Sequence, residues 1–256
     1  MGDLSEGSAK PPLSLLQISL IVRDLEAAIR DFEAALGLRV AFRDPGVALW
    51  GLENAVLPMG RTFIELLSPT RADTPGGRHL ARQGGDGGYM VILQTDDLDA
   101  WRDHLGRIGV RIAWQGETRD EARDLAWAGL HLHPRDTGGM MISFDRPDPP
   151  ESWAGAGPHW RDHVVQDVVD ELIGIELRSP DPLRLAERWA EVLGRPVEAE
   201  GRIDLDRGML GFAPGGEGSD APERSPEGLA RVSLRATDRK REGERIPLAG
   251  VEFVLV

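Results

Sequence analysis

Apolar and polar residues alternate near the start of the chain and then change to a helical period. In residues 17–22, QISLIV, every second residue from Ile18 is apolar, which is the pattern of a strand with two distinct faces. From Asp24 the apolar positions recur three or four residues apart as far as Leu36, and Gly37 follows. The pattern predicts a strand over 15–22 and then a helix with an Asp24 N-cap.

The same strand-and-helix order returns twice along the chain. Aligned on their Asp caps, residues 24–40 and 181–197 keep the cap, one core aromatic residue and the terminal glycine in register. Residues 90–110 give a third copy, with Asp97 as the cap and Gly109 as the stop. We therefore expect a chain built from repeated βα units.

Shorter patterns complete each unit. Brief apolar runs separated by turn residues predict strands over 47–49, 55–58 and 62–67 in the first unit. The glycine-rich residues 70–88 are expected to form a flexible crossover. In the last unit the polar residues 238–248 stand where a helix would be, so that helix is expected to be lost.

A change of composition marks a boundary between two halves. Residues 147–167 are rich in proline and tryptophan and cannot form one regular element, so we interpret them as a linker. The predicted divisions are a disordered lead over 1–12, a first domain over 13–146, the linker, and a second domain over 168–256.

Composition narrows the classes of function and partner. The chain has 256 residues, 41% of them hydrophobic, which is enough for a packed core. Its polar N-terminus and the absence of an apolar run of about 20 residues predict a cytoplasmic protein with no membrane partner. A net charge of −13 disfavours binding to nucleic acid, and the lack of cysteine excludes disulfides, thiolate ligands and a cysteine nucleophile.

Several motifs together resemble the vicinal oxygen chelate superfamily, which includes glyoxalases, methylmalonyl-CoA epimerases, extradiol dioxygenases and bleomycin-resistance proteins. They are the repeated strand, Asp-capped helix and Leu-Gly stop, the strand FIELL at 63–67, and the turn HPRDTGG at 133–139, which is similar to the H-P-K-D-x-x-G turn of the epimerase-like branch. The resemblance implies an α+β fold of repeated βαβββ modules. Two modules would pair into an N-terminal cup-shaped half-barrel, followed by a degenerate second pair.

The resemblance also indicates where a metal would bind. In this family the first and last strands of each module supply four ligands to a divalent metal, at positions that correspond here to Gln17, Glu65, Met90 and Ser143. A thioether and a serine hydroxyl suit such a metal poorly. Gln17 and Glu65 remain weak metal candidates, a divalent metal is disfavoured, and no other cofactor is expected. Nothing in the spacing requires His131, His133 or Asp145 to compensate.

Strand alternation places Gln17, Ser19 and Ile21 toward the cup, together with Glu65. Burial among apolar side chains would raise the pKa of Glu65 and suit it to proton transfer beside a carbonyl group. Alternatively, Glu65 pairs with an arginine or accepts a hydrogen bond from Gln17. The candidate ligand-binding residues are Gln17, Ser19, Phe63, Met90, Ile92, Met141 and Ser143.

Two functions of different classes remain. One is a glyoxalase-like or epimerase-like lyase or isomerase that acts on a small oxygenated carbon skeleton such as a CoA thioester, with Glu65 as base and Gln17 or Ser143 orienting the oxygen. The other is a metal-free protein that sequesters an apolar small molecule, as bleomycin-resistance relatives do. In both cases the partner is a small molecule, and a homodimer is left open. The second half, where charged residues share strand faces, is expected to be scaffold or lid.

Overall fold

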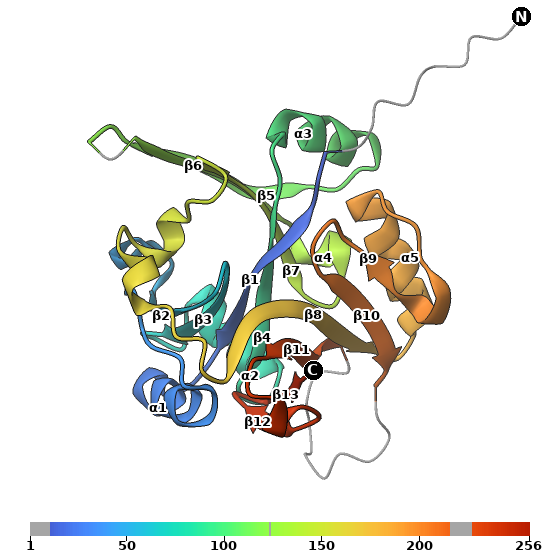
Figure 1. The fold of residues 1–256 in the computed structure, drawn as a ribbon. Coiled ribbons are helices and arrows are strands. Elements are labelled where there is room, and N and C mark those ends of the chain that lie inside the picture. Colours follow the sequence, from blue (N-terminus) through green and yellow to red (C-terminus); the bar gives the residue numbers. More distant parts are fainter. Residues whose placement is uncertain (1–10, 123, 216–226) are drawn as a thin grey trace, which may run out of the picture.

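A computed structural model describes residues 11–122, 124–215 and 227–256, which form two β-sheets packed on a shared core (Figure 1). The first sheet has seven strands in the order β2-β3-β1-β4-β7-β6-β5 and is curled into a half-barrel. The second has six strands in the order β12-β13-β11-β8-β10-β9. The α+β class and the repeated modules predicted from the sequence are confirmed.

The first half of the chain supplies the curled sheet. Its elements are β1 (Ser14–Ile21), α1 (Leu25–Leu36), the 3-10 helix η1 (Pro45–Trp50), β2 (Leu52–Met59), β3 (Thr62–Pro69), α2 (Pro75–Arg82), β4 (Gly87–Gln94), α3 (Leu98–Arg107), β5 (Ile112–Asp120), β6 (Leu125–Leu132), α4 (Pro134–Thr137) and β7 (Met141–Asp148). β1 and β4 lie antiparallel at its centre, so one module extends to each side.

The second half supplies the other sheet after two 3-10 turns, η2 (Ala154–Ala156) and η3 (Trp160–His163). Its elements are β8 (Val169–Ser179), α5 (Pro182–Leu193), η4 (Ala199–Gly201), β9 (Ile203–Asp204), β10 (Met209–Pro214), β11 (Gly228–Ala236), η5 (Arg239–Arg241), β12 (Arg245–Leu248) and β13 (Val251–Leu255). Residues 238–248 hold only a 3-10 turn and a short strand, as expected from their polar composition. Residues 216–226, between β10 and β11, lie outside the described residues.

The three predicted Asp caps are confirmed. The side chain of Asp24 accepts a hydrogen bond from the backbone N–H of Ala27 at 2.9 Å, and Asp97 and Asp181 make the corresponding bonds in α3 and α5. Gly37 and Gly194 end α1 and α5 in the left-handed conformation, which glycine adopts without strain.

Two local predictions are wrong. Residues 47–49 lie in η1 instead of a strand, because Pro45 occupies its first turn and the side chain of Asp44 caps it by accepting from the N–H of Gly46 at 2.8 Å. The crossover 70–88 contains α2, which begins at Pro75 after a Thr74 N-cap. Here proline and a cap outweigh the low helix propensity of the glycines.

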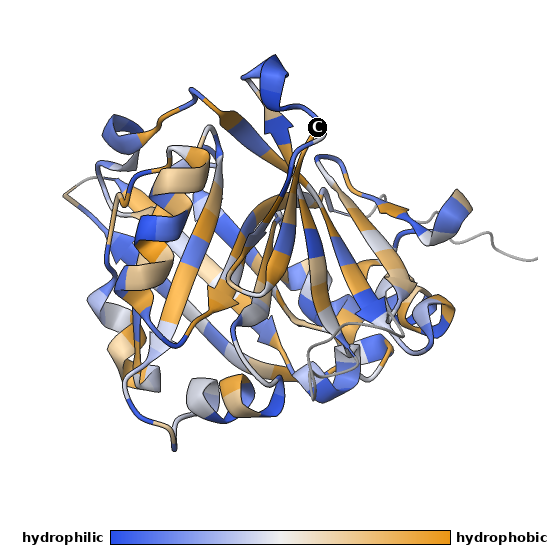
Figure 2. Ribbon diagram, turned by 90° about the horizontal axis from the view of Figure 1, so that it is seen from below, coloured by the Kyte–Doolittle hydropathy of each residue, from blue (hydrophilic) through white to orange (hydrophobic). Residues whose placement is uncertain are grey.

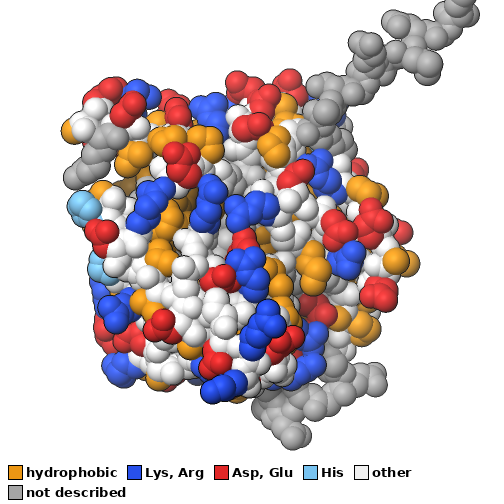
Figure 3. Space-filling model, viewed as in Figure 1, with side chains coloured by type: hydrophobic (Ala, Val, Ile, Leu, Met, Phe, Trp, Pro, Cys, Tyr) orange, Lys and Arg blue, Asp and Glu red, His pale blue; other side chains and the backbone are white. Residues whose placement is uncertain are grey.

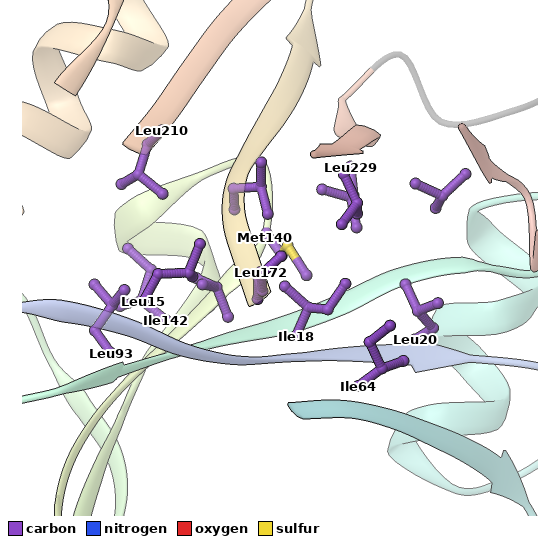
Figure 4. Close-up of a cluster of buried hydrophobic side chains, with 14 of the residues drawn as sticks. Leu15, Ile18, Leu20, Ile64, Leu93, Met140, Ile142, Leu172, Leu210 and Leu229 are labelled. Atoms are coloured by element: carbon purple, nitrogen blue, oxygen red, sulfur yellow. The ribbon is translucent and has the colours of Figure 1, made fainter. Parts of the chain in front are cut away.

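The two sheets share one apolar core, shown in Figure 4. Ile18, Leu20 and Ile64 of the first sheet face Leu172 and Leu229 of the second in this view. At Gly88 in β4 the sheets approach so closely that a Cβ atom there would lie 2.4 Å from the Cβ of Leu229. Along the strands, hydrophobic residues alternate with hydrophilic ones (Figure 2).

The outer surface carries both signs of charge. On the face shown in Figure 3, arginine and lysine side chains are interspersed with aspartate and glutamate. Among the described helices, none combines the length and apolar character needed to cross a bilayer.

Candidate functional site

The concave face of the curled sheet brings three predicted residues together. Glu65 on β3 pairs in register with Ser19 on β1, and Gln17 lies two residues earlier on the same face. The Oε2 atom of Glu65 accepts hydrogen bonds from Ser19 Oγ at 2.6 Å and from Gln17 Nε2 at 2.9 Å. Strand alternation predicted the shared face of Gln17 and Ser19, and the family position predicted Glu65.

Asn54 on β2 completes the hydrogen bonding of the Glu65 carboxyl group. Its Nδ2 atom donates to Glu65 Oε1 at 2.7 Å, while its Oδ1 atom accepts from the backbone N–H of Asp44 at 2.7 Å. Both carboxyl oxygens of Glu65 are thus held by side-chain donors. Sequence analysis missed Asn54, although its spacing of two from Val56 on a predicted strand could have placed it on this face.

A second carboxyl group lies buried across the cup. Asp145 on β7 accepts hydrogen bonds from the hydroxyl of Ser143 and, at 2.5 Å, from Trp127 Nε1 on β6. It occupies room left by Gly129, where a Cβ atom would lie 2.9 Å from Asp145 Oδ2. Ser143, predicted to bind ligand, therefore orients this acid.

The two acids resist ionisation. Burial raises the pKa of Glu65, and its three hydrogen-bond donors oppose this rise only in part. Burial likewise raises the pKa of Asp145 to about 7, with a further contribution from the charge of Glu65. A fraction of Asp145 is consequently protonated at neutral pH and able to donate a proton.

Apolar side chains surround these polar groups. Phe63, Met90 and Ile92, all predicted as lining, are buried in one cluster with Leu16 and Val56, and Met141 packs at its edge. Trp153, Ala156 and Trp160 from the predicted linker join the same cluster. Trp153 Nε1 donates to Gln17 Oε1 at 2.7 Å. No local signal in the sequence indicated that the linker docks here.

The donor set does not fit a divalent metal. The oxygens of Glu65 already accept from three N–H or O–H groups, Met90 offers a thioether, and Ser143 is bonded to Asp145. Within the part of the chain that the structure describes, no group of three His, Cys, Asp or Glu residues is arranged to hold a metal.

The neighbouring histidines contribute to packing and turn structure. His131 packs on Trp114 with ring centroids 4.5 Å apart, and burial lowers its pKa to about 4. His133 Nδ1 accepts from the backbone N–H of Arg135 within the HPRDTGG turn. That turn also contacts α5, since Trp189 Nε1 donates to Gly138 O at 3.3 Å.

Charged residues of the second sheet pair with one another, as the sequence suggested. Arg231 lies 2.8 Å from Glu252 and 3.2 Å from Glu176, while Arg235 lies 2.6 Å from both Asp170 and Glu171. Arg231 and Glu252, which correspond to two of the family's ligand positions in the second half, are therefore paired with each other.

Comparisons with known proteins place this chain in a family. A family model described as a glyoxalase-like domain matches residues 18–193. An ethylmalonyl-CoA/methylmalonyl-CoA epimerase from Cereibacter sphaeroides is 28% identical over 136 residues, which cover 52% of this chain and 96% of the relative. The mitochondrial methylmalonyl-CoA epimerase of Homo sapiens is 25% identical over 132 residues, covering 52% of this chain and 73% of the relative.

A solved structure extends the likeness to both sheets. A hypothetical protein from Staphylococcus aureus superimposes with a TM-score of 0.70 at 13% identity, covering 95% of this chain and 99% of that one. At this identity the likeness concerns the fold alone. A similar overall fold thus occurs in another protein.

Proposed function

Because this chain belongs to the glyoxalase-like domain family of the vicinal oxygen chelate superfamily, we propose that its N-terminal cup binds a small organic ligand and that Glu65 exchanges a proton with it. The observation that carries the proposal is the fixed, buried Glu65 carboxyl group. Its two oxygens are oriented by Ser19, Gln17 and Asn54, and its pKa is raised. A carboxylate with these properties is a stronger base than one in water.

The chemistry is proton transfer at a carbon next to a carbonyl group. Glu65 takes the C–H proton, the electron pair moves into the carbonyl to form an enolate, and a proton then returns to carbon. Asp145 is a suitable proton donor to the developing enolate, since part of it is protonated at neutral pH. Inversion requires that Glu65 keeps the proton it removed and that Asp145 delivers its own proton to the opposite face of the carbon, which leaves Glu65 protonated and Asp145 ionised.

A CoA thioester is the first substrate class to test. The epimerase relatives are named for such esters, and their similarity covers about half of this chain. A thioester carbonyl acidifies the adjacent C–H, as the proposed step requires. No metal enters the proposal, because the residues in the cup do not form a metal-binding set.

The test is exchange of the α-proton of methylmalonyl-CoA in deuterium oxide, followed by NMR. Wild-type protein should accelerate exchange, and Glu65→Gln should lower the rate by about 10²-fold or more. The control is Thr62→Ser. Thr62 lies on β3, but its hydroxyl group donates to Met59 O, so serine keeps this bond and leaves the cup intact. Asn54→Asp would add a charge to the cup and is not suitable as a control. Equal exchange rates in wild type and Glu65→Gln would contradict the role of Glu65 as base.

The second candidate is a binding protein without chemistry. It is favoured by the apolar lining of Phe63, Met90 and Met141, since methionine adapts to varied ligands. In that case wild type and Glu65→Gln would bind ligand with similar affinity, and neither would accelerate exchange.

A further inference from the structure

The segment between the two sheets covers the cup. We name residues 149–164 the strap; it crosses from the end of β7 past β2 and β6 and appears in yellow on the left of Figure 1. Trp153 and Trp160 of the strap are only 4% and 5% exposed, and both pack on Phe63, with ring centroids 6.3 and 5.0 Å away. The strap therefore fills the space above Glu65 with two indole rings.

The covered cup has no room for a ligand at the strap's edge. The void between Leu16, Phe63, Trp153 and Trp160 measures about 10 Å³, which is no more than the space of about one water molecule. Gln17, Ser19 and Asp145 are each at most 3% exposed. A ligand that enters from this side must displace the strap to reach Gln17.

The strap is bonded mostly to itself. Its turns are closed by local bonds such as Ala156 N to Trp153 O and Asp162 N to His159 O, and Arg161 lies over the Trp160 ring at 4.4 Å. In the described ranges, two hydrogen bonds join it to the curled sheet: Trp153 Nε1 to Gln17 Oε1, and Gln94 Nε2 to Pro150 O. Lifting it breaks no bond between strands.

We propose that the strap is a displaceable lid, and that the Trp153 indole occupies the place of the ligand in the cup. The proposal rests on the proposed function of the cup as a ligand site. The ligand it implies is a flat aromatic or heteroaromatic group that carries an N–H or O–H donor, either as a whole molecule or as the acyl part of a thioester.

The ligand must carry a hydrogen-bond donor because of the side chain of Gln17. Its Nε2 atom is committed to Glu65, so its buried Oε1 atom needs a donor, which Trp153 supplies while the lid is closed. A ligand that replaced the indole without a donor would leave this oxygen unpaired in an apolar setting. The flat shape follows from Phe63, against which the indole lies.

The test measures binding of indole and of indene, which has the same shape without the N–H group, to the full chain by titration calorimetry. Hydrogen exchange of residues 149–164 is followed with and without indole. We expect wild type to bind indole at least about tenfold more tightly than indene, with faster exchange in the strap. Trp153→Phe, which loses the bond to Gln17, should bind indole about tenfold more tightly than wild type.

The matched control is Trp101→Phe. Trp101 is a buried tryptophan of α3 whose Nε1 atom donates to Thr95 Oγ1 at 2.9 Å, so this variant loses the same kind of bond away from the cup. It should leave indole binding unchanged. An equal gain in indole affinity in both variants would show that the effect comes from general destabilisation, and would contradict the proposal that the strap is a lid.

The remaining outcomes separate the lid from the proposed function. If indole shifts the Gln17 side-chain NMR signal while strap exchange stays constant, the cup is a ligand site but the lid is wrong. A third outcome is that Trp153→Phe speeds hydrogen exchange in the strap but binds neither indole nor methylmalonyl-CoA. In that case Trp153 does not occupy a ligand's place, and the cup is not a binding site. If the α-proton of methylmalonyl-CoA exchanges while hydrogen exchange in the strap stays constant, the proposed function is supported and the lid is wrong.

Discussion

Asp145 illustrates how a single buried side chain makes stability depend on pH. An unperturbed Asp titrates near 3.8, while folded Asp145 titrates at about 7 because burial disfavours its charge. Between these pH values the folded protein binds the extra proton, so this group makes the free energy of unfolding fall as the pH rises through the window.

Asp145→Asn removes this titration. We expect the free energy of unfolding of the variant, relative to wild type, to rise between pH 4 and 7 by at most about 4 kcal/mol and then to level off. His131, with its pKa lowered to about 4, contributes the opposite slope over nearly the same range, but it is present in both proteins and cancels in the difference. Urea unfolding at a series of pH values measures the effect.

Asp136→Asn serves as the control for this experiment. Hydrogen bonds from Arg111 lower the pKa of Asp136, so its contribution is lost only as the pH falls below the ordinary range of an Asp. Between pH 5 and 8 the difference from wild type should be constant. A flat difference for Asp145→Asn over pH 4 to 7 would instead show that Asp145 is ionised throughout.

Single residues of the site were predictable where strand alternation decided them. Gln17, Ser19 and Glu65 follow from the pattern of one strand and a family position on another, and their hydrogen bonds join them. Trp153 was not predictable, because its place is set by tertiary docking of a segment whose own sequence has no period. The roles assigned to these residues in binding and proton transfer stay predictions.

At the scale of elements, the helix caps and the periodic apolar stripes were the features that predicted where the longer helices lie. The helices with an Asp cap, an apolar stripe and a nearby glycine were identified at nearly their observed bounds. η1 and α2 were missed because both are short, and α2 contains two glycines that pack in tight places, with Gly76 against Leu52. Such elements depend on their neighbours more than on intrinsic propensity.

The caps themselves give a prediction for α1. Asp24→Ala should lower the free energy of unfolding by about 1 kcal/mol, because the N–H of Ala27 loses its acceptor at the helix start. Asp24→Asn retains an acceptor and should cost less. Chemical denaturation of both variants measures the difference, and an equally large loss in Asn would mean that charge near the helix terminus matters more than the hydrogen bond.

At the scale of the whole molecule, the shared core joins the two halves. Phe32 of α1 packs edge-on against Phe253 of β13 at 5.2 Å, and Thr62 Oγ1 accepts from the backbone N–H of Leu172 at 2.8 Å. The boundary over 147–167 stays a prediction about organisation along the chain. From these contacts we expect each half to stabilise the other.

We therefore expect one unfolding transition for the whole chain. Leu172→Ala should lower the free energy of unfolding by about 2–5 kcal/mol and shift the transition equally for probes in both sheets. Leu183→Ala, at a side chain that is 61% exposed, should have little effect. Two transitions, of which only the second moves in Leu172→Ala, would show that the halves unfold independently.

The close approach of the two sheets at Gly88 limits the size of the residue at this position. Even a methyl group at this position would meet the Cβ atom of Leu229 at 2.4 Å, with a φ value that strains nothing, so size alone is limiting. A chain of similar length with alanine or a larger residue here would have to separate its sheets or shift one strand. This spacing of the two sheets therefore depends on glycine at position 88.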